Sequence, residues 1–123
     1  MSDEEELKIP EWLPLNAREE SLLEQCTRED VELSEETRKQ TRVSLYYKGL
    51  IEFAGIAENY IQTYRATAKG IQALRITKIM RRLGMPRQAR QVMRYDTRDL
   101  SDLLTALQER AKKQDSIGQP NEN

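Results

Sequence analysis

One regularity limits the folds open to this chain. No proline falls between Ser34 and Pro86, and apolar residues within this stretch recur at alternating intervals of four and three. Such spacing places its members on one face of a helix, as in the heptad repeat of a coiled coil. It therefore predicts a long central helix with a continuous seam; the seam consists of Val43, Tyr47, Leu50, Ala54, Ala57, Ile61, Tyr64, Ala68 and Ile71.

The seam loses its phase at Arg75, where the next apolar residue would fall. An unbroken helix from Ser34 to Leu83 would be ~75 Å long, which exceeds the width of a compact domain of this size. Either the helix bends or breaks near residues 65–73, or the protein is an elongated oligomer. We favour a break or kink.

Shorter helices are expected on both sides of this region. Asn16 followed by Glu19 is a capping box that begins a helix ending near Cys26. Gly84 and Pro86 end the central helix, and a short basic helix follows from Pro86 to about Tyr95. The last helix is amphipathic, with an apolar stripe of Leu100, Leu103, Leu104 and Leu107.

No alternation typical of strands and no hairpin signal was found. The predicted fold class is therefore all-α, with about five helices. The expected organisation is an acidic, tryptophan-containing extended arm at residues 1–15, a helical domain at residues 16–113 and a disordered tail at residues 114–123. Within the arm, Trp12 and Leu13 either dock into another protein or fold back onto the domain's own helices.

Charge is divided unevenly along the chain, although the net charge is only −1. Residues 1–37 hold 13 acidic and 3 basic residues, whereas residues 38–95 hold 2 acidic and 13 basic residues. Such asymmetry predicts an anionic partner for the basic part, either within the chain or outside it.

The basic residues concentrate in the stretch ITKIMRRLGMPRQARQVMRY, residues 76–95, which contains no acidic residue. It resembles the helix-turn-helix pattern of DNA-binding proteins, with Met80, Leu83, Gly84, Met85 and Met93 at the positions of the small or apolar residues and the turn glycine. It departs from the pattern at Arg90, where the motif has a buried aliphatic residue, and at Met80, where the motif has a smaller one. The candidate nucleic-acid-binding residues are Arg75, Lys78, Arg81, Arg82, Arg87, Gln88, Arg90, Gln91, Arg94 and Tyr95.

Three interpretations of this basic face remain open from the sequence. Arginine side chains suit phosphates, so the face is a candidate for contact with DNA or RNA. It is also a candidate for contact with an acidic protein surface. In the third interpretation, the acidic N-terminal part of the chain itself neutralises the face.

Several functional classes are disfavoured by what the chain contains. There is no histidine, which removes the commonest general base and metal ligand, so we expect no catalytic site, metal or cofactor and no small-molecule substrate. Cys26 has no partner for an internal disulfide and is expected as a small buried residue. No stretch is apolar enough for a membrane span and no export signal is recognised, so we expect a cytoplasmic location.

These observations lead to two alternative functions. The first is a small, non-enzymatic helical accessory subunit that contacts nucleic acid through its central basic face and a protein through its acidic arm. The second is an adaptor or assembly factor that oligomerises or docks a partner through the seam at residues 43–71, without nucleic acid.

Overall fold

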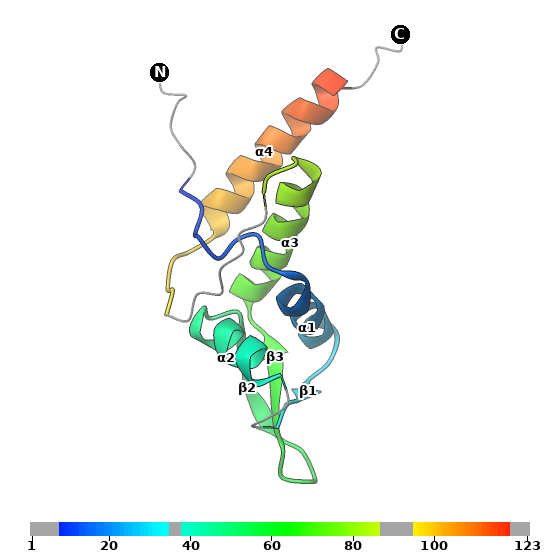
Figure 1. Ribbon diagram of the computed structural model, residues 1–123, viewed down its shortest axis with the longest axis vertical. Helices are drawn as coiled ribbons and strands as arrows, with labels where there is room; N and C mark the ends of the chain where they lie inside the picture. The colour runs from blue at the N-terminus through cyan, green and yellow to red at the C-terminus, as the bar shows by residue number, and fades with distance from the viewer. Residues whose placement is uncertain (1–7, 35–37, 87–94, 119–123) are drawn as a thin grey trace.

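The computed structural model describes residues 8–34, 38–86 and 95–118 (Figure 1). In these ranges the chain forms four helices and a three-stranded antiparallel sheet. The elements, in order, are α1 (Ala17–Arg28), β1 (Val31–Glu32), α2 (Lys39–Tyr47), β2 (Ile51–Ile56), β3 (Gln62–Ala66), α3 (Ala68–Arg82) and α4 (Ser101–Gly118). The fold class is α+β, so the prediction of an all-α bundle with five helices is wrong.

The expected long central helix is replaced by a helix, a β-hairpin and a second helix. The first helix, α2, ends at Gly49, whose φ of +75° is a left-handed conformation that glycine adopts without strain. The Gly49 amide donates to the Tyr46 carbonyl and the Leu50 amide to the Leu45 carbonyl, which is the Schellman arrangement of a helix C-terminus. The chain then turns into β2, so neither the continuous helix nor a coiled coil forms.

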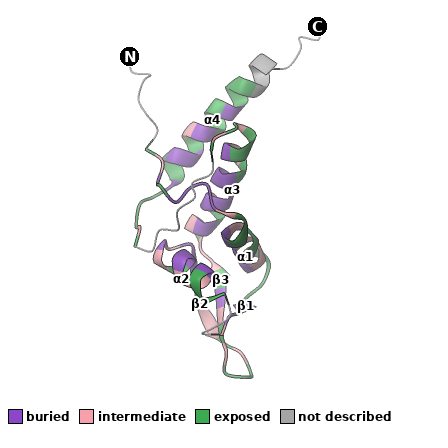
Figure 2. Cartoon of the chain, viewed as in Figure 1, coloured by how far each residue is buried: buried purple, intermediate pink, exposed green. Residues whose placement is uncertain are grey.

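The hairpin has features that the heptad interpretation overlooked. Phe53 of β2 lies opposite Tyr64 of β3, and a bulge follows between Phe53 and Gly55. Asn59 initiates the turn, because its side-chain oxygen accepts a hydrogen bond from the Ile61 amide at 3.2 Å. Tyr60, in this loop, has a φ of +66° and is 89% exposed. Most of the loop between β2 and β3 is exposed (Figure 2).

The sheet is small, and β3 is its central strand in the order β1-β3-β2. Val31 of β1 lies opposite Tyr64 on one side, while Glu52 of β2 lies opposite Arg65 on the other and pairs with it at 3.0 Å. Tyr64 is buried, whereas Phe53 directly opposite it is half exposed, so the cover over this face thins from the central strand β3 toward the edge strand β2.

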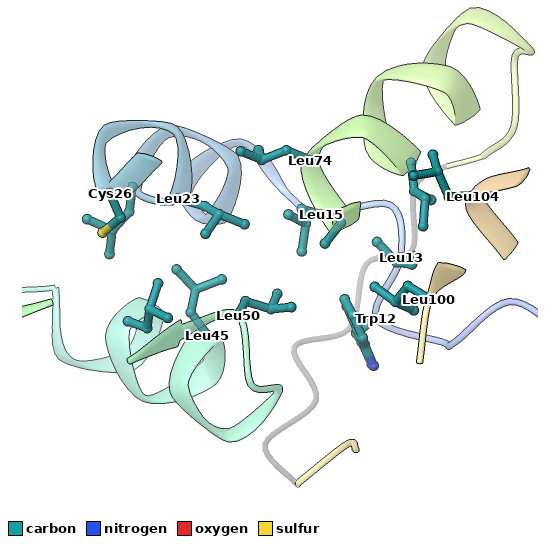
Figure 3. Packing of buried hydrophobic residues seen from close by; sticks show 14 of the residues in the cluster. Trp12, Leu13, Leu15, Leu23, Cys26, Leu45, Leu50, Leu74, Leu100 and Leu104 are labelled. Atoms are coloured by element: carbon teal, nitrogen blue, oxygen red, sulfur yellow. The ribbon is translucent and has the colours of Figure 1, made fainter. Parts of the chain in front are cut away.

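The core is a leucine-rich cluster enclosed by the helices (Figure 3). Residues of the N-terminal segment enter this cluster, and Trp12 is only 3% exposed. Each leucine buried in this way contributes about 1.5–3 kcal/mol of transfer free energy. The principal members are Trp12, Leu13, Leu15, Leu22, Leu23, Leu45, Leu50, Ile51, Leu74, Ile76, Leu100 and Leu107.

Several local predictions are confirmed. Asn16 and Glu19 form the capping box at the start of α1. Gly84, with φ of +72°, ends α3, and the Met85 amide donates to the Met80 carbonyl in a second Schellman arrangement. Cys26 is a buried free thiol.

The predicted apolar stripe of α4 is buried, with Leu100, Leu103, Leu104 and Leu107 facing the core. Helix α4 packs along α3 and ends at Gly118, beyond residue 113 where the sequence placed the end of the helical domain (Figure 1). None of the helices in the described ranges combines the length and the apolarity that crossing a bilayer requires.

Candidate nucleic-acid interface

Helix α3 carries the part of the predicted basic face that the structure describes. Its start is fixed by Thr67, whose side chain accepts a hydrogen bond from the Gly70 amide and whose hydroxyl donates to the Gly49 carbonyl at 2.6 Å. Gly70 lies against the connection between α2 and β2, since a Cβ at this position would be 2.2 Å from the Leu50 carbonyl oxygen. These contacts fix the position of α3 relative to α2 and the hairpin.

One face of α3 is buried and the opposite face is basic. The buried residues are Gly70, Ala73, Leu74, Ile76, Thr77 and Met80. Ile71, Arg75, Lys78 and Arg82 are all exposed and are spaced four, three and four residues apart, which places them in one row. Helix α3 contains no acidic residue, so it has no carboxylate of its own to offset this row.

Two cations of α3 pair with carboxylates of α1. Lys78 lies 3.1 Å from Glu24, and Arg81 pairs with Glu20. The side chains of Lys78 and Arg81 nevertheless remain 55% and 52% exposed. Neutralisation by the acidic N-terminal part of the chain is therefore present but partial.

Five predicted contact residues lie outside the described ranges: Arg87, Gln88, Arg90, Gln91 and Arg94. The second half of the helix-turn-helix resemblance, including Met93, lies outside them too. What the structure describes is the first helix and the glycine turn of that resemblance, with Leu83 and Met85 packed against the core.

Tyr95, one of the predicted contact residues, is 70% exposed and lies next to α2. Its ring centroid is 4.6 Å from that of Tyr47, with a tilt of 37° between the planes. One face of Tyr95 is thus occupied by Tyr47, and the structure brings neither ring into the row on α3.

Asp96, the next residue, joins four parts of the chain. Its carboxylate accepts hydrogen bonds from Trp12 Nε1 and Arg98 Nη2, both at 2.6 Å, and lies 3.5 Å from Lys69 Nζ. The Lys69 ammonium also donates to the Asp96 carbonyl, and the Asp96 amide donates to the Tyr47 carbonyl at 3.2 Å. The N-terminal segment, α2, α3 and the approach to α4 therefore meet at one residue, Asp96.

The pKa of Asp96 reflects this environment. Burial acts to raise it, but the hydrogen bonds from Arg98 and Trp12 and the charge of Lys69 outweigh burial. The net effect holds the pKa well below the usual range of an aspartate. Burial lowers the pKa of Lys69, and Asp96 offsets part of that effect.

A second polar cluster is buried between α1 and α2. Lys48 Nζ lies 2.9 Å from Glu19 Oε2 and 2.6 Å from Ser44 Oγ, and the Ser44 hydroxyl donates to the same Glu19 oxygen at 2.8 Å. Ser44 is fully buried and Lys48 nearly so. Each member bonds to both of the others, so we interpret the cluster as structural and not as a reactive serine–lysine pair.

The residues predicted for a protein interface do not share one face. Trp12 and Leu13 lie in the core, which is the folded-back alternative for the N-terminal segment. The seam is divided among four elements and the connections between them, and its members range from buried to exposed. Val43 and Tyr47 belong to α2, Ala54 to β2, Tyr64 to β3, and Ala68 and Ile71 to α3, while Leu50, Ala57 and Ile61 lie in the connections.

Sequence reasoning missed both polar clusters. Nothing in the sequence relates Asp96 to Trp12, which is 84 residues away. Lys48 and Ser44 are four residues apart on α2, a spacing that places them on one helical face, but nothing in the sequence pairs them with Glu19. No group of residues suited to holding a metal ion occurs in the described ranges.

Comparison of the chain with models of protein families, with curated proteins and with solved structures finds no match in any of the three. Inference about function therefore depends on the chemistry of the surface.

Proposed function

We propose that this chain is a non-enzymatic binding module that contacts nucleic-acid phosphates through the basic face of α3. The observation that carries the proposal is the exposed row of Arg75, Lys78 and Arg82 on a helix without any acidic residue. Arg81 lies beside the row and remains half exposed. Guanidinium groups bind phosphate oxygens with two parallel hydrogen bonds, which suits this row to a phosphate backbone.

The carboxylates of α1 do not argue against such contact. An exposed ion pair contributes only about 0–1 kcal/mol, so Lys78 can exchange Glu24 for a phosphate at little cost. The row from Arg75 to Arg82 is about 10 Å long at 1.5 Å per residue. That length corresponds to about three phosphates along one strand of a duplex.

The test is fluorescence anisotropy with a mixed-sequence duplex and a single-stranded oligonucleotide, at several salt concentrations. With three to four phosphate contacts from α3, we expect log–log salt slopes of about −3 on duplex DNA. The doubly reversed variant Arg75→Glu/Arg82→Glu should bind at least about tenfold more weakly, because each lost contact also becomes a repulsion.

A matched control carries the same change in net charge at the other end of the molecule. Arg28→Glu/Arg65→Glu alters the end of α1 and the sheet, and it should bind nearly as tightly as the parent protein. Circular dichroism establishes that both variants fold. If both folded variants lost the same affinity, the loss would be explained by net charge and not by the position of the residues. If the α3 variant bound as tightly as the parent protein, the proposed face would be refuted.

A further inference from the structure

We propose that Glu20 of α1 withholds Arg81 from nucleic acid, so that α3 offers three phosphate-binding side chains and not four. The three are Arg75, Lys78 and Arg82. Because this concerns the number of phosphates that α3 contacts, it rests on the proposed function. Glu20 is then a positioning residue, which affects nucleic-acid binding only through Arg81.

The two ion pairs between α1 and α3 differ in the burial of their carboxylates. The Glu24 side chain is 37% exposed, whereas that of Glu20 is only 14% exposed. If Lys78 leaves Glu24, water solvates the freed carboxylate. If Arg81 leaves Glu20, the carboxylate loses its cation at a site that water reaches poorly, which is costly. Arg81, whose Nη2 donates to Glu20 Oε1, is therefore held more firmly than Lys78.

The position of Arg81 on α3 directs its side chain away from the row. With about 100° between successive residues of a helix, Arg81 lies about 60° from Lys78 and about 120° from Arg75. This places it on the side of α3 that faces α1, where it lines a cavity of about 240 Å³ together with Pro14 and Leu15 of the N-terminal segment. A phosphate backbone that follows the row therefore passes beside Arg81 and not over it.

Glu20 also repels a phosphate that approaches Arg81 from solvent. The Arg81 side chain is 52% exposed, so a phosphate can reach it while the pair with Glu20 stays intact. That phosphate would lie near the Glu20 carboxylate, and like charges brought together at an interface oppose binding. Without the charge of Glu20, Arg81 can turn toward the row and supply a fourth contact.

The experiment repeats the anisotropy titrations on the mixed-sequence duplex with further variants. Glu20→Gln keeps the shape of the side chain but removes its charge. It should bind about fivefold more tightly, the gain expected for one additional hydrogen bond to a phosphate. The salt slope should steepen from about −3 to about −4, because each phosphate contact adds about −0.9 on duplex DNA.

Glu24→Gln is the matched control, because it makes the same change in net charge one turn away on the same helix. It should gain less affinity than Glu20→Gln and keep the slope near −3, since Lys78 already contacts phosphate in the parent protein. The double variant Glu20→Gln/Arg81→Gln should return to the affinity and slope of the parent protein, because the freed arginine is no longer present. Circular dichroism establishes that each variant folds.

Equal affinities and equal slopes for Glu20→Gln and Glu24→Gln would overturn the proposal, because net charge alone would then explain any gain. A gain for Glu20→Gln that persists when Arg81→Gln is added would also overturn it. If the parent protein binds through the row but Glu20→Gln gains nothing, the proposed function stands and only the role of Glu20 is refuted. If the parent protein does not bind the duplex, both are refuted.

Discussion

The indole nitrogen of Trp12 donates a 2.6 Å hydrogen bond to the carboxylate of Asp96, a residue 84 positions along the chain. The same indole ring lies under two ammonium groups, with its centroid 5.5 Å from Lys48 Nζ and 5.8 Å from Lys69 Nζ. The N-terminal segment is therefore fixed by its polar edge as well as by its apolar surface. This arrangement makes Trp12 part of the folded domain.

Replacing Trp12 by Phe should destabilise the protein by about 2 kcal/mol, because a hydrogen bond to a charged group is lost and the smaller ring fills less of the core. Urea unfolding followed by circular dichroism measures the change. Tyr60→Phe, which removes an exposed hydroxyl in the hairpin loop, should change stability by less than about 0.5 kcal/mol. Equal unfolding midpoints for Trp12→Phe and the parent protein would contradict the role assigned to the hydrogen bond.

Asp96 should make stability depend on acid pH. Its pKa is lower in the folded protein than in the unfolded chain, so its contribution is complete above the unfolded value, near 3.8, and is lost as pH falls toward the folded value. Between about pH 5 and pH 3 the parent protein should therefore lose stability faster than Asp96→Asn, which should be less stable at pH 7. Urea midpoints at pH 7, 5, 4 and 3 measure both effects, and parallel curves for the two proteins would exclude Asp96 as the source.

Gly70→Ala should destabilise the protein by about 3 kcal/mol or more, because the new methyl group would overlap the backbone carbonyl of Leu50. Gly84→Ala provides the comparison. Nothing lies within 4 Å of a Cβ at Gly84, so the cost there is only that of a left-handed alanine, about 1 kcal/mol. Thermal unfolding shows which of the two variants is less stable. A Gly70→Ala protein as stable as Gly84→Ala would contradict the close approach of α3 to the backbone of Leu50.

Lys48→Met should cost about 3–5 kcal/mol, because it leaves the buried Glu19 carboxylate without its cation. The double variant Glu19→Gln/Lys48→Met should recover part of this loss, since the uncompensated charge is then removed. Urea unfolding of the two single variants and the double variant forms a double-mutant cycle. If the losses of unfolding free energy in the two single variants added up to the loss in the double variant, the two side chains would contribute to stability independently.

The local helix signals in this sequence were reliable because they depend on neighbouring residues. Two of these signals depend on residues a few positions apart: the capping box of Asn16 and Glu19, and the glycine at which α3 ends, Gly84. The third, the leucine stripe of α4, depends on the helical period within that one helix. Patterns of this kind predicted α1, the end of α3 and the buried face of α4.

The hairpin was missed because spacing alone does not distinguish the two structures. The intervals of four and three between Val43 and Ile71 fit a heptad, yet residues seven apart lie on opposite faces of a strand. The deciding signals were local: Gly49 in a left-handed conformation, Gly55 at a bulge and Asn59 in a turn. Strand-forming residues such as Ile51, Phe53 and Tyr64 accompany them.

The candidate sites were predictable only in part. The row of Arg75, Lys78 and Arg82 follows from helical spacing, and the structure keeps it exposed. The buried cluster of Glu19, Ser44 and Lys48 was not predictable, because Glu19 meets the other two side chains only through the packing of α1 against α2. No pattern in the sequence relates them.

Trp12 is the only tryptophan of the chain, and it lies where the N-terminal segment meets α2, α3 and Asp96. Its fluorescence therefore comes from a single, known position and needs no engineered label. Detachment of the N-terminal segment would move the indole from a dry site between two cations into water, and a red shift of its emission would record that event even while the helices stay intact.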